Sequence, residues 1–90
     1  MLFEWDEAKR RSNITKHGID FQRALQMFDG RPRLDIGSPR RGEERSLSVA
    51  ILDGRLVTIV WVWRNDDMIR IISVRRARRA EEGQYRQIHG

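Results

Sequence analysis

The feature that most constrains the fold is the dipeptide Asp53-Gly54, which lies between two stretches that favour β-strands. Residues 46–51 alternate apolar side chains with small ones, and residues 56–63 are apolar apart from Thr58. An Asp-Gly pair favours a two-residue hairpin turn, because both residues tolerate the positive φ angles that this turn requires. The sequence therefore predicts an antiparallel hairpin, and the β-branched and aromatic residues of 56–63 suit a central strand.

Further strands are predicted on either side of this hairpin. Residues 69–76 form a third strand after a polar turn at residues 64–67, and residues 2–4 are a candidate short strand. Residues 37–44 are rich in Gly, Ser, Pro and charged residues, so we expect an exposed loop there.

Three helices are predicted outside the strands. Asp6 and Asp20 are candidate N-caps for a helix over residues 7–16 and a second over residues 21–28. Apolar side chains of the second helix recur at i, i+3, i+4 and i+7, which forms one apolar face. Residues 77–88 permit a C-terminal helix. The first two helices are each followed by a glycine that can end them, Gly18 and Gly30.

These elements predict an α+β fold in one domain, residues 1–90. Two N-terminal helices pack on one face of an antiparallel β-meander, and a C-terminal helix follows. A chain of 90 residues has room for one hydrophobic core and no second.

Side chains alternate along a strand, so the expected pairing divides the sheet into two faces. The hairpin pairs Ala50 with Val57, and an even-numbered loop after Trp63 would place Trp61 opposite Arg70. The helices are expected on the face that carries Leu47, Val49, Ile51, Leu56, Val60, Val62, Ile69 and Ile71. The other face is expected to be the floor of an open cleft and carries Ser46, Ser48, Ala50, Val57, Ile59, Trp61, Trp63, Arg70, Ile72 and Arg76.

Composition excludes several classes of protein. The chain contains no cysteine, which excludes disulfides, zinc–thiolate sites and a cysteine nucleophile. No group of residues has metal-ligand spacing and no Gly-rich phosphate loop is present, so we expect no metal and no cofactor. No membrane-length apolar run or signal peptide is visible, and a cytoplasmic protein without a membrane partner is expected.

The net charge of +5 and the excess of arginine over lysine point to an anionic partner. The strongest signal is a cluster of arginines near two tryptophans: Arg70, Arg75, Arg76, Arg78 and Arg79, with Trp61 and Trp63. Arginine neutralises phosphates and aromatic rings stack on unpaired bases. The same residues also suit a solvated basic surface and an apolar core. Composition alone does not separate RNA from DNA or from an acidic protein.

Individual candidates each have two interpretations. His17 is either a general acid or base or a cation at a helix C-terminus, where it favours the helix dipole. Glu43 and Glu44 either form a base or a cation site, or are a solvated pair that leads into a strand. Tyr85 either stacks or donates a proton, or anchors the last helix on the core. His89 lies in the C-terminal tail and receives no function.

Two blocks carry a resemblance to a known family: residues 16–21 (KHGIDF) and residues 70–77 (RIISVRRA). Together with Phe3-Glu4-Trp5-Asp6 and Gly42-Glu43-Glu44-Arg45, they resemble the BrnT toxin family over almost the whole chain. The resemblance implies a RelE-like fold and a bacterial type II toxin. Such a toxin is a metal-independent endoribonuclease that attacks RNA through its 2′-hydroxyl and inhibits growth.

The resemblance also implies site residues. It assigns catalysis to Lys16, Arg70, Arg76 and Glu44, and RNA binding to His17, Arg64, Arg75, Arg79, Trp61, Trp63 and Tyr85. Arginines would stabilise the negative charge that builds on the phosphoryl oxygens. The position just before Arg64, acidic in relatives, is Trp63 here, so Glu43, Glu44, Asp66 or Asp67 would have to supply the base.

The implied partner is a ribbon-helix-helix antitoxin of the BrnA type, in a 2:2 complex that binds operator DNA through the antitoxin. Two alternatives stay open at this point. The chain could be a catalytically weakened homologue that serves mainly as the antitoxin's partner in operon autoregulation, or a stand-alone nucleic-acid-binding module.

Overall fold

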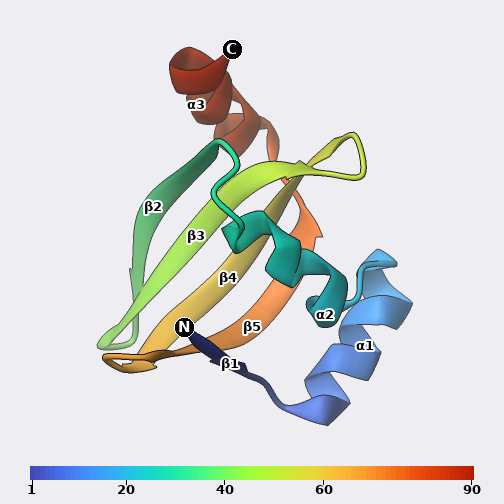
Figure 1. Ribbon diagram of the computed structural model, residues 1–90, viewed down its shortest axis with the longest axis vertical. Helices are drawn as coiled ribbons and strands as arrows, with labels where there is room; N and C mark the ends of the chain where they lie inside the picture. The colour runs from blue at the N-terminus through green and yellow to red at the C-terminus, as the bar shows by residue number, and fades with distance from the viewer.

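A five-stranded sheet forms the centre of the structure, a computed structural model that describes residues 1–90 (Figure 1). In chain order the elements are β1 (Leu2–Glu4), α1 (Glu7–His17), α2 (Phe21–Ala24), the 3-10 turn η1 (Leu25–Phe28), β2 (Arg33–Arg40), β3 (Glu43–Leu52), β4 (Arg55–Asn65), β5 (Met68–Arg76) and α3 (Arg79–His89). The strand order is β1-β5-β4-β3-β2, with β1 parallel to β5 and the other pairs antiparallel. The α+β class is therefore as predicted, and none of the helices is long and apolar enough to cross a bilayer.

The Asp53-Gly54 hairpin forms as the sequence predicts. Both turn residues have positive φ angles, 52° at Asp53 and 78° at Gly54. The register pairs Leu52 with Arg55 and continues through Ser46 with Trp61. Asp6 and Asp20 also cap their helices, since each carboxylate accepts a backbone N–H of the first turn.

The expected loop at residues 37–44 is wrong. β2 runs to Arg40 and β3 begins at Glu43, so Arg41-Gly42 is a second two-residue turn with φ angles of 53° and 78°. The strand was hidden because Gly, Ser, Pro and charged residues follow Leu34 and Ile36, and such residues favour a loop. Pairing with β3 supplies the backbone hydrogen bonds that these weak β-formers need.

The predicted faces of the hairpin are reversed. The main core lies on the face of Ala50, Val57, Ile59 and Trp61, where Phe21, Ala24 and Met27 of α2 and η1 pack. Trp61, expected on an open cleft floor, is 5% exposed and its indole N–H donates to the Ser48 hydroxyl at 2.7 Å. Both faces of the hairpin are apolar enough to be covered, so the alternation divides the residues correctly without showing which set the helices bury.

The pairing of β4 with β5 also differs from the expectation. Register shifts occur between Val60 and Trp61 and between Trp63 and Asn65, and they place Trp61 opposite Ile71 and Arg76 opposite Val57. Such irregularities change which side chains share a face, and a simple loop count does not detect them.

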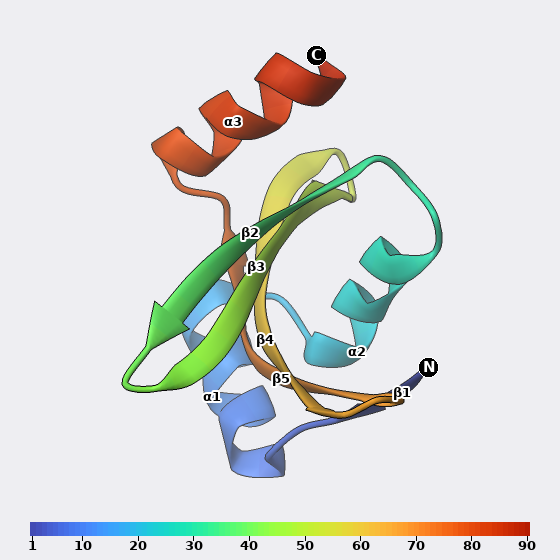
Figure 2. The same ribbon diagram turned by 90° about the vertical axis from the view of Figure 1, so that its left-hand side faces the viewer.

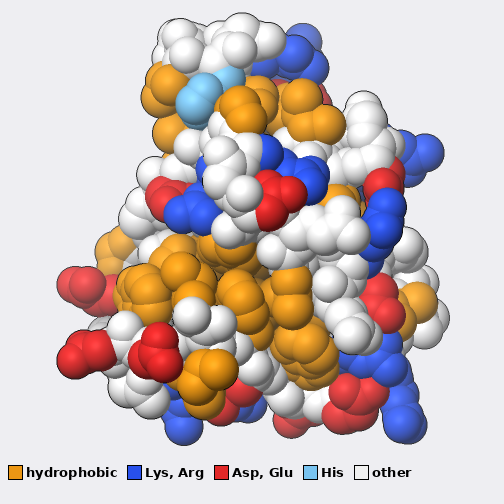
Figure 3. Space-filling view, in the orientation of Figure 1, with side chains coloured by type: hydrophobic (Ala, Val, Ile, Leu, Met, Phe, Trp, Pro, Cys, Tyr) orange, Lys and Arg blue, Asp and Glu red, His pale blue; other side chains and the backbone are white.

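The sheet face opposite α2, named here the second sheet face, is covered only at one end. Tyr85 of α3 packs on Val49 and Leu56, with Leu34 and Ile36 at the margin. Figure 2 shows α3 at this end and α1 beyond β5, with the α2 segment on the opposite side of the sheet. On the α2 side, apolar side chains reach the surface below α2 (Figure 3), and Trp63 is 52% exposed.

The free edge of β5 is covered by α1. β1 pairs with β5 only as far as Arg70, and the Asn13 side chain takes the place of a strand partner farther along. Its amide donates to the Val74 carbonyl at 2.8 Å and accepts the Val74 N–H at 3.1 Å. The arrangement of two N-terminal helices on one face is thus not confirmed, since α1 contacts the sheet at this edge.

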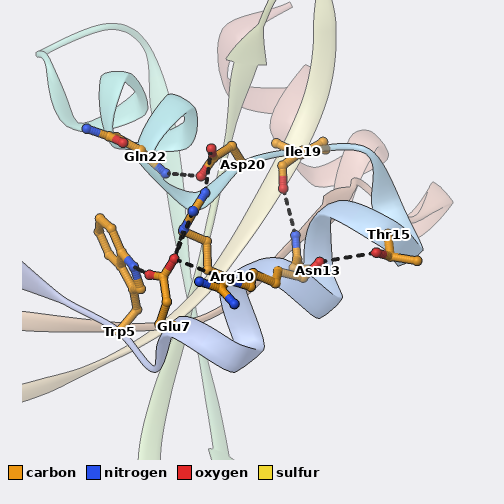
Figure 4. Close-up of polar contacts among 9 residues, drawn as sticks. Trp5, Glu7, Arg10, Asn13, Thr15, Ile19, Asp20 and Gln22 are labelled. Atoms are coloured by element: carbon orange, nitrogen blue, oxygen red, sulfur yellow. Dashed lines mark hydrogen bonds and ion pairs between the residues drawn. The ribbon is translucent and has the colours of Figure 1, made fainter.

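The end of α1 is held in place by the segment that follows it (Figure 4). Asn13 also donates to the Ile19 carbonyl at 3.0 Å, and Arg10 pairs with Asp20 at 2.8 Å. Gly18 ends the helix in the left-handed conformation with φ of 70°. These contacts place His17 at the edge of the sheet.

Candidate nucleic-acid site

A cavity rich in arginine lies on the uncovered part of the second sheet face. Its volume is about 340 Å³, and it is named here the basic cavity. Its lining comes from the end of α1, from β2 to β5, and from the residue before α3: His17, Ser38, Arg40, Arg45, Leu47, Val60, Ile72, Ser73, Arg75 and Arg78. The lining includes four arginines and no acidic residue, so its potential favours an anion.

Arg75 is the most firmly held of these arginines. Its guanidinium makes two parallel hydrogen bonds to the Glu81 carboxylate, at 2.8 and 2.9 Å, and its side chain is 14% exposed. The same carboxylate accepts the Thr58 hydroxyl and the Arg78 backbone N–H. The Arg75 hydrogen bonds are the main reason that the pKa of Glu81 falls to about 2, against the opposing effect of burial. Glu81 therefore stays ionised and fixes the direction of Arg75.

Of the other three arginines, two form no ion pair within the chain. Arg45 pairs with Glu43 at 2.8 Å. Arg40 and Arg78 have no carboxylate within ion-pair distance. An unpaired guanidinium can offer its donors to a phosphate without first breaking an internal ion pair.

His17 is the only histidine that lines the basic cavity, and an imidazole ring is a common general acid or base in catalysis. It occupies the last turn of α1, exposed, and its ring makes no hydrogen bond within the chain. Glu44, the other candidate base, lies in an adjacent cavity of about 600 Å³, named the hairpin cavity, with Trp63 and Arg64. Ser38 and Arg45 line both cavities, so the two are contiguous.

Comparison with known proteins identifies the family. The family model described as "Ribonuclease toxin, BrnT, of type II toxin-antitoxin system" matches residues 5–81. The chain belongs to the BrnT family. Among solved structures it is similar to the ribonuclease toxin BrnT of Brucella abortus, with a TM-score of 0.66 and 24% identity over 88% of this chain and 100% of the other. No curated protein sequence matches the chain.

The structure distributes the residues that the BrnT resemblance assigned. His17 and Arg75 line the basic cavity, and Glu44, Trp63 and Arg64 line the hairpin cavity. Arg76 lines a third cavity on the α2 side of the sheet, which His17 also lines. These assigned residues are therefore divided among three cavities rather than gathered in one. His17 lines both the basic cavity and the third cavity, and Arg45 lines both the basic cavity and the hairpin cavity.

The remaining assigned residues lie elsewhere. Arg70 pairs with Glu4 at 3.0 Å, and Glu4 also binds Arg64. Trp61 and Tyr85 are buried in the two core clusters, which leaves no ring face for an RNA base. Lys16 and Arg79 are exposed and line none of the cavities.

Sequence reasoning missed Arg40 and Arg45 because it assigned most of this segment to a loop. The available signal was alternation: Arg40 follows Leu34, Ile36 and Ser38 at every second position. Arg45 precedes Leu47 and Val49 in the same way on β3. A strand assignment would have placed both arginines on the face of the basic cavity.

Proposed function

We propose that this BrnT-family chain is an endoribonuclease that holds RNA in the basic cavity and cleaves it by 2′-hydroxyl attack. The observation that carries the proposal is the joining of His17 with four arginines around one acid-free cavity. A phosphodiester is the anion that needs both features, since its cleavage requires charge stabilisation and proton transfer.

In this proposal the scissile phosphate binds between Arg75, held by Glu81, and the unpaired Arg40 and Arg78. The hairpin cavity shares Ser38 and Arg45 with the basic cavity, and its exposed Trp63 lies on the α2 side of the sheet. An unpaired base can stack on this ring where the RNA strand passes round the end of the sheet. A splayed single strand is the form of RNA that can use both contacts.

The proton transfers follow from the same placement. His17 accepts the proton of the 2′-hydroxyl as that oxygen forms a bond to phosphorus. The bond from phosphorus to the 5′-oxygen breaks, and the leaving oxygen takes a proton from water. The products are a 2′,3′-cyclic phosphate and a 5′-hydroxyl, and the arginines stabilise the charge on the phosphoryl oxygens.

The reaction is proposed to need no metal ion. No group of three or more His, Asp or Glu side chains is positioned to hold one, and the guanidinium groups supply the positive charge. Cleavage is therefore expected to continue in the presence of a chelator.

A first test measures growth on expression and cleavage of single-stranded RNA by the purified protein. Arg78→Ala and Arg40→Ala remove arginines without internal ion pairs, so these variants should fold normally. Each should slow cleavage on the order of 10²-fold, because one donor to the phosphoryl oxygens is removed. His17→Ala should slow cleavage at least as much, whereas Glu44→Gln should have a small effect.

Arg11→Ala is the matched control, since Arg11 is 77% exposed on α1 and lines none of the cavities. Normal growth with intact RNA in the wild type would instead favour the weakened homologue that serves operon autoregulation. Cleavage that is equal in Arg78→Ala and Arg11→Ala would reject the basic cavity as the site.

A further inference from the structure

The third cavity, which Arg76 and His17 line, lies on the α2 side of the sheet, next to the end of α1. Its volume is about 530 Å³, and it is named here the edge cavity. The charged residues of its lining are Asp20, Arg23, Asp53, Arg55 and Arg76, and His17 completes the group.

The acidic groups of the edge cavity are already occupied. Asp53 pairs with Arg23, which lowers the pKa of this carboxyl below its ordinary value. Asp20 accepts the Gln22 N–H and pairs with Arg10. Arg55 and Arg76 are exposed and form no ion pair within the chain, so two free guanidinium groups remain for an external anion.

His17 connects the edge cavity with the basic cavity, because it lines both. The connection follows from the position of α1 at the free edge of β5, where Asn13 binds the Val74 backbone. Arg75 and Arg76 are consecutive on β5, and their partners across the sheet are Thr58 and Val57. Their side chains therefore leave the strand on opposite faces, one toward each cavity.

We infer that the edge cavity binds a phosphate of the same RNA strand that the basic cavity holds, beyond the cleavage site. The strand leaves Arg75 and Arg78, passes over the end of α1 at His17, and reaches Arg76 and Arg55. This inference rests on the proposed function and extends it. It predicts that the protein binds single-stranded RNA over nucleotides beyond the scissile phosphate.

The test measures binding of uncleavable 2′-O-methyl RNA of about four and about twelve nucleotides by fluorescence anisotropy. The wild type should bind the longer RNA more tightly. Arg55→Ala/Arg76→Ala should weaken binding of the longer RNA about 3- to 10-fold and leave the shorter RNA unchanged. The slope of log affinity against log salt should fall by about 0.7 for each phosphate that the variant no longer neutralises.

The controls separate this inference from the proposed function. Arg78→Ala should weaken binding of both RNAs, and Arg11→Ala should weaken neither. If Arg55→Ala/Arg76→Ala matches Arg11→Ala on both lengths while Arg78→Ala still weakens binding, the edge cavity is not an RNA subsite and the proposed function stands. If the wild type binds neither RNA and cleaves none, both proposals are rejected.

Discussion

At the scale of single residues, Glu81 connects three parts of the fold. Its carboxylate joins Arg75, Thr58 and the start of α3, and its side chain is 10% exposed. The folded-state pKa of about 2 lies below the ordinary value of 4.5, so ionised Glu81 stabilises the fold above about pH 4.5. This contribution, on the order of 3 kcal/mol, is lost as the pH falls from there toward 2.

Glu81→Gln should therefore lower the free energy of unfolding at pH 7 by about 3 kcal/mol and flatten the loss of stability between pH 5 and 2. Urea denaturation at several pH values measures both effects. Glu82→Gln is the control on the same helical turn. The lowered pKa of Asp29, also about 2, leaves some acid sensitivity in every variant, so the difference between the two is the quantity to compare. Equal profiles for the two variants would show that Glu81 does not have this role.

At the scale of elements, two glycines on helices should respond in opposite directions to alanine. Gly18 ends α1 with φ of 70°, where an L side chain is strained, whereas Gly83 lies inside α3 with a helical backbone. An added Cβ meets no atom within 4 Å at either position, so backbone conformation alone decides the sign. Gly18→Ala should destabilise by about 1 kcal/mol, and Gly83→Ala should stabilise by about 0.5–1 kcal/mol. Thermal unfolding of both variants checks this, and a stable Gly18→Ala would contradict the assigned end of α1.

At the scale of the whole molecule, the antitoxin should determine the assembly. A type II toxin has an antitoxin partner, and we propose a ribbon-helix-helix dimer that binds one toxin per subunit and carries the complex to operator DNA. The toxin's charge of +5 favours an acidic or amphipathic antitoxin segment that binds over its basic surface. The rate of association should therefore fall as salt rises, while the rate of dissociation changes little. Light scattering should give a 2:2 complex and a monomeric free toxin. A 1:1 complex, or a stable toxin dimer, would contradict this arrangement.

Local sequence was sufficient for the features that depend on neighbouring residues. Asp6 and Asp20 specify two helix starts, Gly18 specifies a helix end, and Asp53-Gly54 specifies a hairpin and its register. Each involves side-chain caps or φ angles within a few residues, so no distant contact is needed to predict it. Family membership was also visible in the sequence, since the resemblance at residues 16–21 and 70–77 led to the family whose model matches residues 5–81.

The tertiary structure alone decided which face of the sheet is open. Both faces are apolar, and the choice depends on where α2 and α3 pack and on the register shifts at Trp61 and Asn65. The same packing buried Trp61, turned residues 33–40 into a strand, and brought Arg40 and Arg45 to Arg75. Distant segments compete for the same apolar surface, and the free energy of that packing is a property of the whole fold that no local pattern records.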